Sequence, residues 1–354
     1  MVIYIEIILI LLLSIILKND KFKKYGIPII FIFTLLIVGT RNELGLDDKN
    51  YIEIFNNVKI GNMNGTRNAE YSYILISQVV AKCGFNYKML FLVYSIMTFG
   101  TMYICIKKLD INKIEFVIFM LSYLIFCFSA FLTTMRQALA ASIVFLAFIM
   151  IKEKKYKRGI LLTIIAGFFH NSAWMCLPIL IIFSDRIKIN NKIKMLIPIL
   201  CLLISKTNIV YVVIKLVNQK LHLGYDTYIL NVGENNFVNS GILVLLMFII
   251  YEFQFFIKTS SKKDEFLYKG QLLYFSIFYI TSGLGFIRRF SYYLLLFESF
   301  ILVSLTRKIE KHYQKNTISI IIIILLCALN IYLINSSDIF QNLKFENISL
   351  NFRS

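Results

Sequence analysis

The strongest constraint on this chain is a repeated pattern of apolar runs separated by short clusters of lysine and arginine. The runs are roughly 15–20 residues long, the length that an α-helix needs to cross a bilayer. Of its 354 residues 58% are hydrophobic and only 16% are charged, against about a quarter charged in soluble domains. Strand-like alternation is absent. The sequence therefore predicts an all-α polytopic membrane protein with about 10 transmembrane helices in a single domain, residues 1–354.

The charge pattern predicts which side of the membrane each loop faces. The net charge of +18 is carried largely by lysines in short loops, which is typical of cytoplasmic loops. No basic folded domain is present to bind nucleic acid. The first run, 3–17, lacks a basic leader and a cleavage site, so we expect a retained helix rather than a signal peptide. The alternation of loops then places the N-terminus and a polar tail, 335–354, outside.

Two longer polar segments are predicted to be outer loops. The first spans residues 41–87 and the second residues 206–239. Each contains an amphipathic stretch too short to cross the membrane, 71–83 in the first loop and 209–221 in the second. We expect both stretches to lie as helices in the membrane interface.

Residues 159–184 do not fit a simple crossing, because basic clusters flank both ends of this apolar segment. A single span would place one of those clusters outside, against the positive-inside rule. The middle of the segment is polar and contains His170. We therefore expect a hairpin or re-entrant pair of short helices with His170 at its tip, which is tolerated where it lines a polar cavity.

Four arginines lie at predicted outer ends of apolar runs: Arg41, Arg136, Arg288 and Arg289. A single such arginine can simply extend to lipid phosphates. Four of them, each beside small or polar residues, favour a site for an anion such as a diphosphate. A guanidinium matches phosphate oxygens with paired hydrogen bonds and stays charged when partly desolvated.

Other candidates could act on a sugar. His170 is either a buried hydrogen-bonding residue or a base, since an ionisable group within a membrane is a functional candidate. Asp47, Asp48 and Glu70 either belong to a solvated loop or supply a base for a hydroxyl. The adjacent aspartates are only a weak indication of a metal, because their side chains point apart. The tyrosines near the outer boundary favour a role as interfacial anchors over sugar stacking: Tyr71, Tyr73, Tyr292 and Tyr293.

Several kinds of chemistry find no support. The six cysteines are scattered, and no CxxC pair indicates a metal site or a disulfide. No nucleotide-binding loop is present, and the inner loops are too short to fold into a nucleotide-binding domain. We therefore expect no metal and no cofactor, and we expect the substrate itself to carry the energy for any reaction.

With these residues placed, the chain resembles the EpsG family, the Wzy-like polymerases of bacterial exopolysaccharide and capsule assembly. The resemblance covers roughly residues 27 to 300. It lies in four motifs: Arg41…Gly45-Leu46-Asp47…Tyr51…Phe55 followed by Glu70; Met135-Arg136-Gln137-Ala138-Leu139-Ala140; Phe169-His170-Asn171-Ser172-Ala173; and Arg289 with Tyr292 or Tyr293.

The resemblance implies a reaction on the outer face of the bacterial cytoplasmic membrane. A growing glycan on undecaprenyl pyrophosphate would be transferred to a lipid-linked repeat unit. The implied catalytic residues are His170, Asp47 and Arg136, with His170 or Asp47 as the base. The implied substrate-binding residues are Arg41, Glu70, Gln137, Ser172, Arg288, Arg289 and Tyr292. The implied partners are the lipid-linked oligosaccharide, the bilayer and other membrane proteins of polysaccharide assembly.

Two other functions remain open. A flippase for the same lipid-linked oligosaccharide would also use arginines, but it should carry cationic residues toward the cytoplasmic side. A membrane O-acyltransferase would also use a histidine within the membrane, yet no companion acidic or asparagine motif is evident.

Overall fold

The computed structural model describes residues 2–66, 69–184, 186–205, 207, 209, 212–213, 215–216, 237–257, 262–281, 285–313, 317–336 and 351–353. These residues are almost entirely helical, and no strand occurs among them. The chain divides into two compact units, which we describe separately: unit 1 comprises Met1–Ser184 and Asn316–Ser354, and unit 2 comprises Asp185–Lys315. The all-α prediction is confirmed, whereas a single domain over 1–354 stays a prediction.

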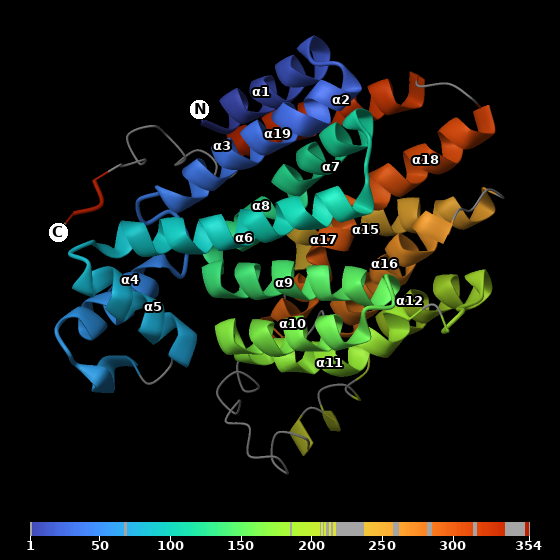
Figure 1. The fold of residues 1–354 in the computed structure, drawn as a ribbon. Coiled ribbons are helices and arrows are strands. Elements are labelled where there is room, and N and C mark those ends of the chain that lie inside the picture. The colour runs from blue at the N-terminus through green and yellow to red at the C-terminus, as the bar shows by residue number, and fades with distance from the viewer. Residues whose placement is uncertain are drawn as a thin grey trace. The chain divides into compact units, whose positions relative to one another are not determined.

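Unit 1 contains most of the predicted site residues, and Figure 1 shows the arrangement of its helices. Its helices are α1 (Val2–Ile16), α2 (Asn19–Lys21), the π-helical turn η1 (Phe22–Gly26), α3 (Ile27–Gly39), α4 (Asp48–Lys59), the 3₁₀ turn η2 (Met63–Thr66), α5 (Tyr71–Lys82), α6 (Tyr87–Leu109), α7 (Lys113–Phe126), α8 (Phe128–Thr133), α9 (Met135–Lys152), α10 (Tyr156–Phe169), the 3₁₀ helix η3 (Asn171–Met175), α11 (Cys176–Ile179), the 3₁₀ helix η4 (Leu180–Phe183) and α19 (Thr317–Ser336).

Unit 2 is also helical in its described residues. Its elements are α12 (Asn191–Ser205), α15 (Phe237–Phe253), the 3₁₀ turn η5 (Gln254–Phe256), α16 (Lys262–Ile280), the 3₁₀ helix η6 (Gly285–Leu294), α17 (Leu295–Ser299) and α18 (Ile301–Tyr313). Helix α16 packs against α12 and against η6.

Five helices in the described part of the chain are long and apolar enough to cross a bilayer: Asn19–Gly39, Tyr87–Leu109, Met135–Lys152, Arg288–Ile309 and Thr317–Ser336. Shorter apolar helices occupy Val2–Ile16, Asn171–Phe183 and Ile242–Phe256. The chain is therefore a helical membrane protein, and the predicted count of about 10 spans is not confirmed. The apolar stretch between Lys113 and Thr133 is divided at Cys127 into the two helices α7 and α8.

The basic loops of unit 1 lie together at one end of its helices. Lys23 forms an ion pair with Asp110 at 2.9 Å, and Lys113 donates to the carbonyl of Leu17 at 3.2 Å. Lys108 approaches Glu153 at 3.1 Å in the loop after α9. The sequence predicts that these loops face the cytoplasm, and their position at one end of the helices agrees with that predicted topology.

The predicted first outer loop, 41–87, folds at the other end of unit 1. Helices α4 and α5 pack against each other beside the start of α6 (Figure 1). Asn86 begins α6 by accepting the backbone N–H of Lys88, and its own N–H donates to the carbonyl of Phe352 at 2.9 Å. Helix α5 matches the helix expected over 71–83, while most of the second loop, 206–239, lies outside the described residues.

Residues 156–183 form a helical hairpin with His170 at its turn. Helix α10 packs along α9, and an added Cβ at Gly159 would lie only 2.6 Å from the side chain of Ile151. After His170, the short helices η3, α11 and η4 return, so that Phe183 stacks on Phe148 with ring centroids 4.1 Å apart. Both ends of the segment thus lie at the same end of α9, which is the hairpin that the basic flanks predicted.

Candidate functional site

The carboxylate of Glu70 lies between two cationic candidates. One oxygen forms an ion pair with Nη1 of Arg136, and the other lies 2.8 Å from Nδ1 of His170. The side chains of Glu70 and Arg136 are largely buried, at 8% and 11% exposure, whereas His170 keeps 23%. Three residues that are distant in the sequence therefore form one connected group, which is open to solvent mainly at His170.

Local backbone structure explains why these side chains converge. Glu70 is the residue immediately before α5, and His170 occupies the extended turn between α10 and η3. Ser72 holds these two segments together, because its hydroxyl donates to the carbonyl of Phe168 at 2.5 Å. Arg136 lies in the first turn of α9, where the helix dipole disfavours a cation. A carboxylate partner compensates for that position.

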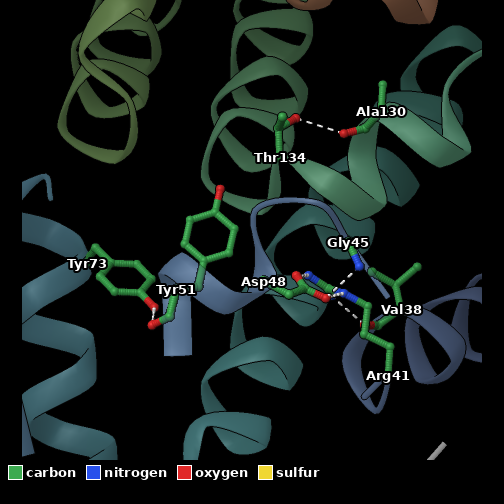
Figure 2. Close-up of polar contacts among 8 residues, drawn as sticks. All are labelled: Val38, Arg41, Gly45, Asp48, Tyr51, Tyr73, Ala130 and Thr134. Atoms are coloured by element: carbon green, nitrogen blue, oxygen red, sulfur yellow. Dashed lines mark hydrogen bonds and ion pairs between the residues drawn. The ribbon is translucent and has the colours of Figure 1, made fainter. Parts of the chain in front are cut away.

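Two tyrosine rings contact the guanidinium of Arg136. Its central carbon lies 5.1 Å from the ring centroid of Tyr51 and 5.3 Å from that of Tyr73, within the range of cation–π attraction. The Tyr73 hydroxyl donates to the carbonyl of Tyr51 at 2.8 Å and so links α5 to α4 (Figure 2). We call Glu70, Arg136, His170, Tyr51 and Tyr73 the Glu70 cluster.

Burial and charge act in opposite directions on the Glu70 carboxyl. Burial alone raises its pKa, but the hydrogen bond from His170 and the charge of Arg136 outweigh burial and hold the pKa below its ordinary value. Glu70 is therefore ionised at neutral pH. For the neighbouring phenol of Tyr51, burial raises the pKa, and the charge of Arg136 offsets only part of that effect.

The contact with Glu70 also selects the tautomer of His170. An ionised carboxylate only accepts hydrogen bonds, so Nδ1 must carry the proton in this contact. A neutral His170 then holds a lone pair on Nε2, the ring nitrogen that Glu70 does not contact. This arrangement allows the imidazole to take a proton at Nε2 while Glu70 stabilises the resulting cation.

Arg41 is surrounded by protein, and its predicted role in substrate binding stays a prediction. Its Nε and Nη2 donate to the two carboxylate oxygens of Asp48 at 2.9 and 2.7 Å, and Nη1 donates to the carbonyl of Val38 at 2.6 Å. Both side chains of the pair are fully buried. Asp47 precedes α4 and is half-buried, and the aspartate that pairs with Arg41 is Asp48, the first residue of α4.

The structure gives the positions of the remaining predicted residues, and their roles stay predictions. Gln137 is buried directly after Arg136, and Ser172 is half-buried in η3. Arg288, Arg289 and Tyr292 lie half-buried on η6 of unit 2, where the guanidinium of Arg288 lies 5.7 Å from the ring centroid of Phe278. That these three residues bind substrate together with Arg136 stays a prediction.

The burial of two tyrosines differs from the interfacial role that the sequence predicts. Tyr73 and Tyr293 are 0% and 1% exposed, whereas Tyr71 is 75% exposed. The signal that could have placed Tyr51 is helical spacing, because Asp48, Tyr51 and Phe55 share the buried face of α4.

No group of three or more His, Cys, Asp or Glu residues in the described part of the chain could hold a metal ion.

Fold and cluster together define a helical membrane protein with a carboxylate that joins an arginine to a histidine at one end of its helices. The profile of the EpsG family matches residues 24–347, nearly the whole chain, and the chain belongs to that family. Comparisons with curated proteins and with solved structures found no match.

Proposed function

We propose that this protein is a Wzy-like polysaccharide polymerase of exopolysaccharide, capsule or O-antigen biosynthesis. It transfers a growing glycan from undecaprenyl pyrophosphate to a lipid-linked repeat unit, on the outer face of the bacterial cytoplasmic membrane. Both termini lie outside the cell membrane in this proposal. Membership in the EpsG family supports the class of reaction. The single observation that carries the proposal is Glu70 joining Arg136 to His170.

The geometry suggests a role for each member of the cluster. Nε2 of His170 takes the proton from the acceptor hydroxyl as its oxygen bonds to the anomeric carbon of the donor glycan. The bond from that carbon to the diphosphate breaks, and its electron pair leaves with the lipid diphosphate. Arg136 stabilises the negative charge that develops on the leaving group, and Glu70 holds both cationic side chains in place.

Substitutions in the cluster test this proposal. We expect Arg136→Ala and His170→Gln each to reduce polymer formation about a hundredfold or more, with single repeat units left on the outer face. Polymer length would be followed on gels and protein in the membrane by immunoblot. Arg158→Ala is the matched control, because Arg158 is exposed at the opposite end of the same hairpin.

The same experiment distinguishes the two other functions. Loss of a flippase would leave single repeat units on the inner face. Loss of an O-acyltransferase would leave chain length unchanged and remove acyl groups from the polymer. Normal long-chain polymer from Arg136→Ala, at normal protein level, would contradict the polymerase proposal.

A further inference from the structure

The ion pair between Arg41 and Asp48 lies close to the Glu70 cluster, yet the proposed reaction does not use it. Both oxygens of Asp48 face the guanidinium in parallel (Figure 2), and neither side chain is exposed. Removing such a pair from water is costly. We therefore ask which segments the buried pair holds in place.

Every donor nitrogen of Arg41 is already engaged by protein. Besides its two bonds to Asp48, it donates through Nη1 to Val38 in the last turn of α3. Its guanidinium carbon lies 4.4 Å from the ring centroid of Phe91 on α6. These contacts join α3, α4 and α6 around one arginine and leave little of it for a substrate.

A continuous series of contacts runs from Arg41 to the cluster. Phe91 meets Tyr51 edge to face, with ring centroids 6.5 Å apart and an interplanar angle of 83°. Tyr51 in turn contacts the guanidinium of Arg136. Asp48 is the first residue of α4, so the ion pair also fixes the helix turn that carries Tyr51.

A second connection runs through the backbone near the start of α9. The N–H of Gly45 donates to Asp48 at 2.8 Å, and an added Cβ at Gly45 would lie 2.8 Å from the carbonyl oxygen of Leu132. Leu132 lies in α8, directly before the turn from which Arg136 projects. Only glycine allows this close approach between the loop and α8.

We propose that Arg41 and Asp48 are positioning residues of the polymerase: their buried pair holds Tyr51 against Arg136 and so sets the orientation of the guanidinium that meets the diphosphate. This inference rests on the proposed function. It assigns Arg41 to the support of the site instead of to substrate binding. Both residues then act on turnover and not on affinity for the lipid-linked donor.

The test is a kinetic comparison on purified protein in liposomes, supplied with lipid-linked repeat units from cells that lack this gene. For Asp48→Asn we expect kcat per folded molecule to fall by about a hundredfold, the scale of a small misplacement, with KM for the lipid-linked substrate nearly unchanged. The folded fraction would be measured by size-exclusion chromatography. A tenfold or larger rise in KM with kcat kept would instead make Arg41 and Asp48 substrate-binding residues and overturn the proposal.

Two further variants keep the proposal testable if Asp48→Asn does not fold. Arg41→Lys keeps the charge but cannot make the paired bonds. Phe91→Leu leaves the ion pair intact and removes the ring between Arg41 and Tyr51. Both should lower kcat per folded molecule, and unchanged turnover in both would overturn the positioning role.

Val58→Ala is the matched control, because Val58 is a buried apolar residue on the same helix, away from the ion pair. It should reduce the folded fraction without changing kcat per folded molecule. If Asp48→Asn behaves as this control does, the pair serves stability alone and the inference fails. Full activity of Arg136→Ala and His170→Gln would overturn the proposed function itself, a result distinct from failure of the positioning role.

Discussion

A single carboxylate, that of Glu70, contacts both Arg136 and His170. Without it, a guanidinium in the first turn of a helix would be a buried and poorly compensated charge. With it, the histidine keeps one defined tautomer and the arginine has a compensating negative charge beside it. Glu70 contacts Arg136 and His170 within the protein, and its role in substrate binding stays a prediction.

The lowered pKa of Glu70 predicts a pH-dependent contribution to stability. A carboxyl whose folded-state pKa lies below its unfolded value stabilises the fold above the unfolded pKa, and this stabilisation is lost as pH falls through the folded pKa. We expect Glu70→Gln to lower the free energy of unfolding by about 3 kcal/mol at pH 7. The difference from the wild type should shrink below about pH 4, near the ordinary pKa of glutamate.

Thermal unfolding in detergent at both pH values measures this difference. Glu53→Gln is the control, because Glu53 is an exposed carboxylate on the neighbouring helix α4. A Glu70→Gln protein as stable as the wild type at neutral pH would show that the cluster does not hold Glu70 in its ionised form.

Among the elements, the hairpin 156–183 matters most, because its turn presents His170 to Glu70. The hairpin is held closed by close packing within it. An added Cβ at Gly167 would lie 2.5 Å from the ring of Trp174, so the two arms meet with no room between them. Glycine is required here by a close approach and not by backbone conformation.

We expect Gly167→Ala to force Trp174 aside and shift His170. Overpacking of this kind costs about 1–3 kcal/mol, and polymer formation should fall by about tenfold, since a factor of ten corresponds to about 1.4 kcal/mol. Adding Trp174→Leu should restore part of the lost activity, because the smaller side chain makes room for the methyl group. Polymer length and protein level would be measured for the single and double variants, and additive losses in the double variant would argue against this contact.

In unit 1 the clusters of basic loop residues and the Glu70 cluster occupy opposite ends of the helices. Lys23, Lys108 and Lys113 meet at one end, while α4 and α5 lie at the other. Helices α1 and α19 fit this arrangement, because the start of α1 meets the end of α19. There the hydroxyl of Tyr4 donates to Asn335 at 2.7 Å. The basic end is the one that the positive-inside rule assigns to the cytoplasm.

Cysteine labelling tests this orientation. Cys83 is exposed at the end of α5, so a membrane-impermeant maleimide should label it in cells whose cytoplasmic membrane is intact. In a Cys83→Ser background, Lys157→Cys at the basic end should react only after that membrane is permeabilised. The opposite pattern would reverse the predicted topology.

The sequence by itself determined the class of structure and the hairpin at residues 159–184. Hydrophobic length and lysine placement predicted a helical membrane protein, and the two basic flanks of 159–184 predicted a hairpin with His170 at its turn. These features follow from local chemistry, because the bilayer requires apolar helices and the cytoplasmic side retains positive loops.

Tertiary structure alone decided which charges are partners. Nothing in the spacing of Glu70, Arg136 and His170 indicates that one carboxylate joins the other two, because each lies on a different element. Likewise, Asp47 and Asp48 are adjacent residues of the same type, and only the helical register of α4 turns Asp48 toward Arg41. Pairing in a buried site depends on how helices pack, and packing is a property of the whole fold rather than of any motif.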